Sequence, residues 1–244
     1  GDIAARAGRE ALMKYLPECI KTLAPDVVIV NGENAAHGIG ITEKYANEIF
    51  DAGANIITLG NHSWDQREVI PYIQREPKLI RPINYPAGTP GNGSVVYTLD
   101  DGRKILVINA MGRLFMDPLD DPFAALDNLV KAHPMWRSVH AIFLDFHAEA
   151  TSEKMAMAHY LDGRVSAVVG THTHIPTADA QIFPKGTAFQ SDAGMTGDYN
   201  SVIGMKIDAP IMRFTRKISL ERLSPAEGEG TLCGTFIVTD DKTG

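Results

Sequence analysis

The feature that most constrains the fold is a series of short apolar runs that alternate with helical patterns along most of the 244 residues. The runs are "DVVIVN" at 26–31, "NIITLG" at 55–60, "VHAIFLDF" at 139–146 and "VSAVVG" at 165–170. Short runs rich in Val and Ile that are bounded by polar or glycine residues predict buried strands. Because strands that alternate with helices are typical of α/β proteins, we expect an α/β domain.

The segments between these runs carry helix signals, with cap residues at their starts and glycine at some of their ends. "SVVYTLD", "DG" and "RKILVINA" predict a hairpin at 94–110, so the sheet is not expected to be purely parallel. Further β structure is expected in the C-terminal part, which ends in "GTLCGTFIVTD". The expected helices span 6–23, 42–53, 121–132 and 152–163, and Pro17 is expected to kink or divide the first.

Length and composition indicate a single domain over residues 1–244, because no stretch resembles a linker. The formal charge of -7 provides no basic surface for duplex nucleic acid, so a small anionic substrate would need a locally positive site, which bound cations can supply. Cys19 and Cys233 indicate neither a disulfide framework nor a thiolate cluster. Since no apolar run approaches the ~20 residues of a membrane span and no signal peptide is visible, we expect a cytoplasmic protein without a membrane partner.

Residues that can bind metal or transfer protons follow the predicted strands where each strand ends. "NGEN" at 31–34 follows the first run, Asn61 and His62 follow the second, His147 follows the third, and "THTH" at 171–174 follows the fourth. In an open α/β sheet the loops beyond the carboxyl ends of the strands converge on the ligand crevice. One carboxylate, the two carboxamides of Asn34 and Asn61 and four histidines at these positions therefore indicate a metal site.

Each of these residues alone has a simpler interpretation. A single histidine more often satisfies its hydrogen bonds within the protein, and asparagine is common in turns. This interpretation is kept for the histidines outside the pattern, which are His37, His133, His140 and His159.

The "HTH" spacing also predicts how far apart the two histidines lie. On extended backbone, His172 and His174 would project to the same side about 6 to 7 Å apart. Each could then bind a different ion of a pair held ~3.5 to 4 Å apart, as in two-metal hydrolytic sites. Oxygen and nitrogen ligands without thiolate favour Fe, Mn or Zn, and the sequence leaves the choice open.

These motifs resemble those of the calcineurin-like metallophosphoesterases, whose hallmarks read here as "GNH" at 60–62 and "GTHTH" at 170–174. "NGENAAHGIGIT", "TLGNHSWD", "RPINYPAGTPG", "DFHAEATSEK", "VVGTHTHIPTAD" and "SDAGMTG" are similar to the bacterial YmdB-like branch, whose members are phosphodiesterases acting on 2′,3′-cyclic nucleotides. The similarity spans essentially the whole chain. It implies a four-layer αββα sandwich of two mixed sheets flanked by helices.

The resemblance also implies the roles of individual residues. Glu33 would bridge two metal ions, and His62 would stand beside them as proton donor. Ala4 occupies a position where the wider superfamily often has histidine, and Glu33 one where aspartate is common, which favours the narrower branch. The first ion would be held by Asp2, Glu33, Asn34 and His174, and the second by Glu33, Asn61, His147 and His172.

Asp2 departs from the family pattern, because the strand expected to precede it is not in the sequence. A strand usually needs about five residues to anchor such a ligand. We expect either that residues precede Gly1 in the protein, or that Asp2 lies on an unanchored end and holds its ion poorly. A C-terminal strand beyond Gly244 is expected for the same reason.

Several other residues have two interpretations. Arg113 could meet a phosphate or be an ordinary surface residue, and "TSEK" at 151–154 is interpreted as a capping box. Asp145 and Glu149 could orient His147, or could be solvated or capping carboxylates. Asn84, Tyr85 and Tyr199 could contact a base, although turn residues of this kind usually lie at the surface.

The expected function is metal-dependent hydrolysis of a small phosphodiester or cyclic nucleotide. A hydroxide bridging two Fe or Mn ions, with Zn as a further option, would attack phosphorus, and His62 would protonate the leaving ribose oxygen. The main alternative is a metal- and nucleotide-binding regulatory protein with little turnover, and a second is a hydrolase of another bond, such as an amide. Association into homo-oligomers is a further implication of the resemblance.

Overall fold

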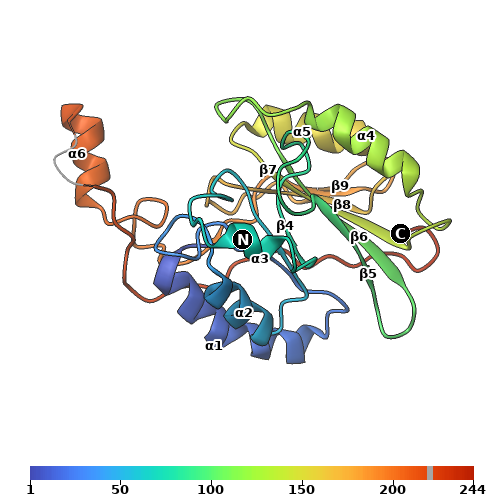
Figure 1. Ribbon diagram of the computed structural model, residues 1–244, viewed down its shortest axis with the longest axis horizontal. Helices are drawn as coiled ribbons and strands as arrows, with labels where there is room; N and C mark the ends of the chain where they lie inside the picture. Colours follow the sequence, from blue (N-terminus) through green and yellow to red (C-terminus); the bar gives the residue numbers. More distant parts are fainter. Residues whose placement is uncertain (219–221) are drawn as a thin grey trace.

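Two β-sheets lie face to face between layers of helices in the computed structural model, which describes residues 1–218 and 222–244 (Figure 1). The first sheet has the order β11-β1-β2-β3-β4 and is parallel throughout. Its strands are β1 (Asp2–Ile3), β2 (Ile29–Asn31), β3 (Ile56–Thr58), β4 (Leu79–Ile80) and β11 (Met195–Thr196).

The second sheet has the order β5-β6-β7-β8-β10-β9 and is mixed, because β5 and β9 run antiparallel to their neighbours. The predicted hairpin is therefore confirmed as β5 and β6, and the predicted pair of sheets flanked by helices is confirmed, although only this sheet is mixed. Its strands are β5 (Ser94–Thr98), β6 (Lys104–Met111), β7 (Ala141–His147), β8 (Ala167–Thr171), β9 (Gln181–Ile182) and β10 (Ala188–Gln190).

Three apolar clusters hold the layers together. One packs α1 (Ala5–Leu23), α2 (Glu43–Asp51) and α3 (Val69–Ile73) on the first sheet, and another packs α4 (Pro122–Ala132) and α5 (Thr151–Leu161) on the second. The third lies between the sheets and includes Ile56, Ile80 and Val107. Each sheet is therefore covered on both faces, which explains the nearly continuous apolar runs of its central strands.

Local cap chemistry accounts for two of the predicted helices. The Thr42 hydroxyl accepts a hydrogen bond from the Tyr45 amide (3.3 Å) at the start of α2, and the Asp121 carboxylate accepts one from the Phe123 amide (2.9 Å) at the start of α4. These bonds satisfy amides that have no partner within the helix. Helix α1 continues through Pro17 as one element.

The interpretation of "TSEK" as a capping box is wrong. Ala150 is the N-cap of α5 and provides no side-chain cap. The Glu153 carboxylate instead accepts hydrogen bonds from the Arg113 and Leu114 amides, at 2.9 to 3.2 Å. Glu153 therefore binds a loop distant in the sequence and not the start of its own helix.

Asp2 is anchored in the sheet although β1 contains only two residues. It pairs in register with Met195 of β11 on one side and with Asn31 of β2 on the other, and its side chain is fully buried. The Asp2 amide also donates to the Gly194 carbonyl (3.0 Å). Because pairing on both sides replaces strand length, the expectation of an unanchored Asp2 is wrong.

The prediction of β structure in "GTLCGTFIVTD" is also wrong. Residues 231–240 form no strand, and only Thr231 makes a bridge, to Gly197. A strand needs a partner that pairs along its length, whereas this segment lines a cavity of about 1180 Å³ between the two sheets.

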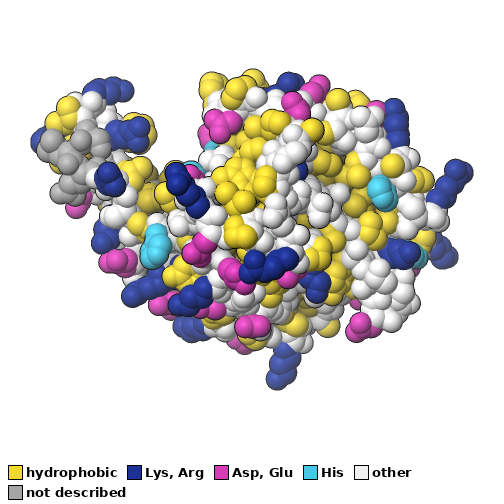
Figure 2. All heavy atoms as spheres, in the orientation of Figure 1, with side chains coloured by type: hydrophobic (Ala, Val, Ile, Leu, Met, Phe, Trp, Pro, Cys, Tyr) yellow, Lys and Arg dark blue, Asp and Glu magenta, His cyan; other side chains and the backbone are white. Residues whose placement is uncertain are grey.

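Helix α6 (Asp208–Arg216), over a segment for which no helix was predicted, projects away from the layers (Figure 1). Figure 2 shows basic side chains on α6 and apolar side chains gathered over the middle of the same face of the molecule. In the part of the chain that is described, no helix combines the length and the apolar character that crossing a bilayer requires.

Core packing gives a first prediction. Leu144 on β7 is completely buried against the helices of the second sheet, so Leu144→Ala is expected to lower the free energy of unfolding by about 2 to 5 kcal/mol. Val96→Ala on β5, where the side chain is 40% exposed, is the control and should have a much smaller effect. Urea denaturation of both variants measures the difference, and equal losses would contradict the assigned core.

Candidate metal centre

The predicted ligands come together where the carboxyl ends of strands from both sheets meet. The first sheet contributes Asp2 from β1 and the residues that follow β2 and β3, and the second contributes His147 from the end of β7 and the residues that follow β8. The expectation that these strand ends converge is therefore confirmed. The residues brought together are Asp2, Glu33, Asn34, Asn61, His147, His172 and His174.

His147 is the centre of one group within this cluster. Its Nε2 lies 3.0 Å from Glu33 Oε1, 2.8 Å from Asn61 Oδ1 and 3.1 Å from His172 Nδ1. Two ligands at adjacent positions around an ion, each bonded at about 2.1 Å, lie roughly 3 Å apart. The spacing of these atoms is therefore that of neighbouring metal ligands, and Glu33, His147 and His172 alone could hold an ion.

Asp2, Asn34 and His174 form the second group. His174 Nε2 lies 3.5 Å from Asp2 Oδ2 and 3.2 Å from Asn34 Nδ2. The same Asn34 nitrogen donates to Glu33 Oε1 (3.2 Å). Glu33 therefore contacts both groups.

Two buried oxygen atoms test whether metal ions fit this cluster. Among the described residues, Asp2 Oδ1 and Asn34 Oδ1 are the buried side-chain atoms without a hydrogen-bond partner. Leaving such atoms without a partner costs about 1 to 3 kcal/mol each, and more for a charged group. Both belong to the second group and are good ligands for a hard cation, so the residues fit a metal ion.

The charges of the cluster also call for a cation. Asp2 and Glu33 are completely buried, and in the described part of the chain both form ion pairs with histidines alone. Burial raises the pKa of Asp2, but the hydrogen bond and charge of His174 outweigh it and hold this pKa at about 2. Burial also raises the pKa of Glu33, but the charge and hydrogen bond of His147 outweigh it and lower this pKa. Both buried carboxylates therefore depend on nearby positive charge.

The histidines of the cluster respond in opposite directions. Burial lowers the pKa of His147, but the Glu33 carboxylate more than compensates and raises it to about 9. Burial and the positive charge of His147 lower the pKa of His172 to about 4. A proton on His147 thus balances the carboxylates, whereas His172 is neutral and has a lone pair available for a cation.

A buried hydrogen-bond chain orients the His147 ring. The Thr171 hydroxyl donates to Asp145 Oδ1 (2.6 Å) and accepts from His147 Nδ1 (2.9 Å), which turns Nε2 towards Glu33. Asp145 Oδ2 also accepts from Thr58 (2.5 Å) and Asn31 (3.1 Å) on the first sheet. Of the two interpretations of Asp145, the structure supports the orienting one, acting through Thr171.

The geometry expected for the "HTH" run is wrong. His172 and His174 lie beyond the end of β8 with φ of 100° and 66°, not on extended backbone. Asp192 holds the turn between them by accepting from the Thr173 amide (3.0 Å) and hydroxyl (2.7 Å). Asp192 is paired with the buried Lys154 at 2.8 Å, a contact that sequence spacing could not predict although "SDAGMTG" contains the aspartate.

His62 lies at the rim of the cluster. Its backbone amide donates to Glu33 Oε2 (3.1 Å), and its Nδ1 lies 2.5 Å from Asp65 Oδ2. The side chain is 34% exposed, whereas His147 is fully buried. Because Asp65 engages Nδ1, the other ring nitrogen is available to exchange a proton with a ligand.

The remaining candidates fall into different roles. Glu149 Oε2 lies 3.0 Å from His172 Nε2, so it can orient this ring. Asn84 is buried and binds backbone groups of Met111, so it cannot contact a base, and the Tyr199 hydroxyl bonds the backbone of Met195.

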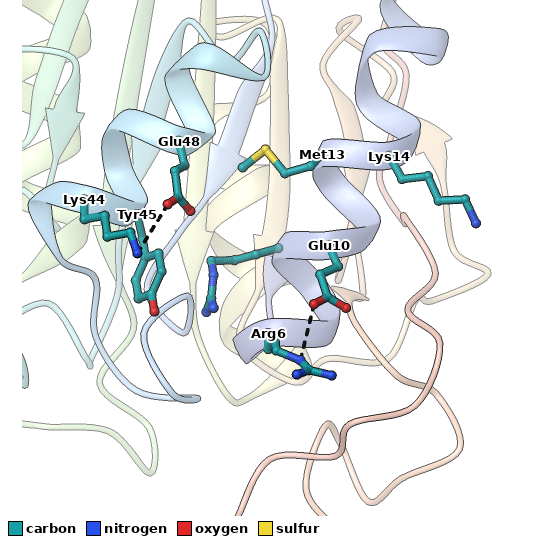
Figure 3. A pocket seen from close by; sticks show the side chains of 8 residues that line it. Arg6, Glu10, Met13, Lys14, Lys44, Tyr45 and Glu48 are labelled. Atoms are coloured by element: carbon teal, nitrogen blue, oxygen red, sulfur yellow. Dashed lines mark ion pairs between the residues drawn. The ribbon is translucent and has the colours of Figure 1, made fainter.

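A hollow of about 550 Å³ between α1 and α2 lies apart from the cluster (Figure 3). Four of its charged side chains pair within their own helices, Arg6 with Glu10 at 3.3 Å and Lys44 with Glu48 at 3.8 Å. The other two also have partners, since Lys14 lies 3.5 Å from the exposed Glu229 and Arg9 lies over the Tyr45 ring. Exposed pairs one helical turn apart contribute only about 0.3 to 0.5 kcal/mol, and they are typical of solvated helix faces. The hollow is therefore interpreted as ordinary surface.

Fold and cluster together define a class of α/β proteins in which carboxylate, amide and imidazole groups from the strand ends of two stacked sheets form a metal-type site. The chain belongs to the YmdB-like family, since the family model described as "YmdB-like protein" matches residues 1–244.

Two relatives match the chain over its whole length. It is 48% identical over 243 residues to the "2′,3′-cyclic-nucleotide 2′-phosphodiesterase" of Bacillus subtilis, covering all of this chain and 90% of the relative. It is 35% identical over 250 residues to a "Putative phosphatase/phosphodiesterase" of Mycoplasma pneumoniae, covering all of this chain and 87% of the relative.

Solved structures share the fold. A hypothetical protein from Thermus thermophilus superimposes with a TM-score of 0.87 at 46% identity, over 94% of this chain and 88% of that one. A structure described as a novel phosphatase from Mycoplasma pneumoniae superimposes with a TM-score of 0.86 at 35% identity, over 93% of this chain and 81% of that one.

Gly60 gives a prediction for the cluster. A Cβ atom at this position would lie 2.3 Å from Glu33 Oε2 and 2.4 Å from His147 Nε2. Gly60→Ala is therefore expected to displace both side chains and to reduce the Mn²⁺ retained after desalting, measured by elemental analysis. Gly234→Ala is the control, because its Cβ would approach no atom closer than 3.8 Å. Equal metal content in the two variants would contradict a site between Glu33 and His147.

Proposed function

We propose that the chain is a dinuclear metal-dependent phosphodiesterase that hydrolyses 2′,3′-cyclic nucleotides. The observation that carries the proposal is a buried cluster in which two groups of ligands share Glu33 and the second group contains two oxygen atoms without hydrogen-bond partners. The name of the Bacillus subtilis relative supports the substrate class. A cytoplasmic location, association into homo-oligomers and a single domain over 1–244 remain predictions.

The two groups of the cluster suggest which residues hold each ion. One ion would be held by Asp2, Asn34, His174 and Glu33, and the other by Asn61, His147, His172 and Glu33. The mixture of oxygen and nitrogen ligands favours Fe or Mn, and also suits Zn. When bound, the ions would supply positive charge for the phosphodiester oxygens and activate water for attack at phosphorus.

The protein residues supply orientation and a proton. Asp145 and Thr171 hold the ring of His147, and Asp192 holds the turn that carries His172 and His174. His62, partly exposed at the rim and engaged by Asp65 through Nδ1, can give its other ring proton to the departing ribose oxygen.

The proposed function is tested with three substrates on protein loaded with Mn²⁺ or Fe²⁺. These are 2′,3′-cyclic AMP, bis-p-nitrophenyl phosphate and p-nitrophenyl phosphate, which is a monoester. We expect turnover of the two diesters to exceed that of the monoester. Absence of diester turnover with two metal ions bound would favour the metal- and nucleotide-binding regulatory protein instead.

The role of His62 gives a sharper prediction. His62→Ala is expected to lower turnover of 2′,3′-cyclic AMP by about 10²- to 10⁴-fold, because an alkoxide leaving group needs a proton. Turnover of bis-p-nitrophenyl phosphate should fall much less, because p-nitrophenolate leaves readily without one.

The test measures steady-state kinetics of each protein on both diesters, together with its metal content. His133→Ala is the control, because His133 lies at the end of α4, outside the cluster, where Nδ1 bonds the Leu129 carbonyl. Equal losses on the two diesters would remove His62 from the role of proton donor.

A further inference from the structure

The loop that follows β6 begins beside the cluster. Met111, the last residue of β6, pairs in register with His147, and the Gly112 amide donates to the His147 carbonyl (3.0 Å). The next residues turn back, since the Met116 amide donates to the Arg113 carbonyl (3.4 Å). Residues 112–117 therefore form a turn directly beyond the end of β6, whose last residue pairs with the predicted metal ligand His147 on the neighbouring strand β7.

Two buried side chains hold this loop in place. Glu153, 8% exposed, accepts hydrogen bonds from the Arg113 and Leu114 amides. Asn84, 1% exposed, donates to the carbonyls of Met111 (2.9 Å) and Asp120 (3.0 Å), on either side of the loop. A carboxylate buried to hold backbone amides of a surface turn makes the turn rigid at the expense of its own hydration.

Phe115 lies within this rigid turn, and its conformation is unfavourable in two respects. Its φ is 62°, a left-handed conformation that is unfavourable for a residue with a side chain, and its side chain is 90% exposed to solvent. Packing within the described chain does not compensate for either. Strain and an exposed aromatic ring on an anchored loop are typical of a surface built for a ligand.

Two further aromatic residues lie close in sequence to His62 and Asn84. Trp64 lies two residues after His62, and Tyr85 directly follows Asn84. Their rings contact edge to face, with centroids 5.8 Å apart. Aromatic side chains therefore lie close in sequence to His62 (Trp64), to Asn84 (Tyr85), and within the loop that Asn84 holds (Phe115).

We propose that Phe115 is the stacking platform for the nucleobase of the substrate, an inference that rests on the proposed function. The strand-end cluster would hold the cyclic phosphate, and the anchored loop would hold the base. A base stacks on an aromatic ring whatever its identity, so this subsite favours nucleotides over simple diesters without selecting one base.

The experiment compares a substrate with a base and one without. Phe115→Ala is expected to raise KM for 2′,3′-cyclic AMP about tenfold with little change in kcat, because a factor of ten corresponds to about 1.4 kcal/mol, which is typical of one base stacked on an aromatic ring. The kinetics of glycerol 1,2-cyclic phosphate, which has the same strained ring but no base, should not change. Phe115→Trp should restore the KM for 2′,3′-cyclic AMP, and Phe236→Ala, also at an exposed phenylalanine, is the control.

Other outcomes overturn the inference. Equal losses on the two cyclic substrates would mean that Phe115 acts through the cluster, and no loss on either would mean that it does not contact the base. A change in oligomeric state of Phe115→Ala by light scattering, with unchanged KM, would assign the ring to a protein contact.

Failure of the proposed function can be recognised separately. If the wild-type protein hydrolyses neither cyclic substrate, the proposed function has failed, and calorimetric binding of adenosine 3′-monophosphate decides the subsite. Weaker binding by Phe115→Ala than by wild type would support it, and equal binding would overturn it.

Discussion

The rest of the site depends on the burial of Asp2 and Glu33 in one cluster. Removing carboxylates from water costs several kcal/mol each unless positive charge and hydrogen bonds compensate. Among the described residues, histidines are the only ion-pair partners of these two carboxylates. The raised pKa of His147 and the lowered pKa of Asp2 both follow from this requirement. A proton on His147 supplies part of the positive charge that the carboxylates need. Asp2 Oδ1 and Asn34 Oδ1 nevertheless have no hydrogen-bond partner. Divalent cations would satisfy all of these groups at once, which is why a metal centre explains the cluster better than a network of histidine ion pairs.

The cluster also depends on how the two sheets are joined. Asp145, on β7, accepts hydrogen bonds from Asn31 and Thr58 of the first sheet and from Thr171 of its own. Its carboxylate, whose pKa burial raises, is thus a polar contact between the sheets beside an apolar cluster, as is Asn109 on β6, whose Oδ1 accepts from the Leu59 amide (3.2 Å). Because directional hydrogen bonds fix relative position more narrowly than apolar packing does, this contact can set the register of one sheet against the other. Ligands contributed by different sheets need that register to remain within reach of one another.

Local signals explain which features could be predicted from the sequence. Thr42 and Asp121 act as caps within their own helices, and the strand-end positions of Glu33, Asn61 and His147 follow from periodicity alone, so both were predictable. Features that depend on residues distant in the sequence could not be predicted. Glu153 has the spacing of a capping residue but binds a loop about forty positions earlier, and the turn at His172 and His174 is fixed by Asp192. Likewise, residues 231–240 have the composition of a strand but lack a partner along their length.

The candidate metal ligands lie at strand ends, whereas Phe115 lies on a loop. This arrangement suggests how substrate preference can change while the metal site stays the same. The candidate ligands lie at the ends of paired strands, where a small displacement would disturb several side chains at once. Phe115 lies instead on a turn whose anchors, Glu153 and Asn84, bind its backbone rather than its side chain. Backbone anchors keep the turn in place whatever residue occupies position 115, so that side chain can change without movement of the cluster. Recognition of the phosphate and recognition of the base are thus assigned to parts of the molecule under different constraints, the first fixed by the sheets and the second open to variation.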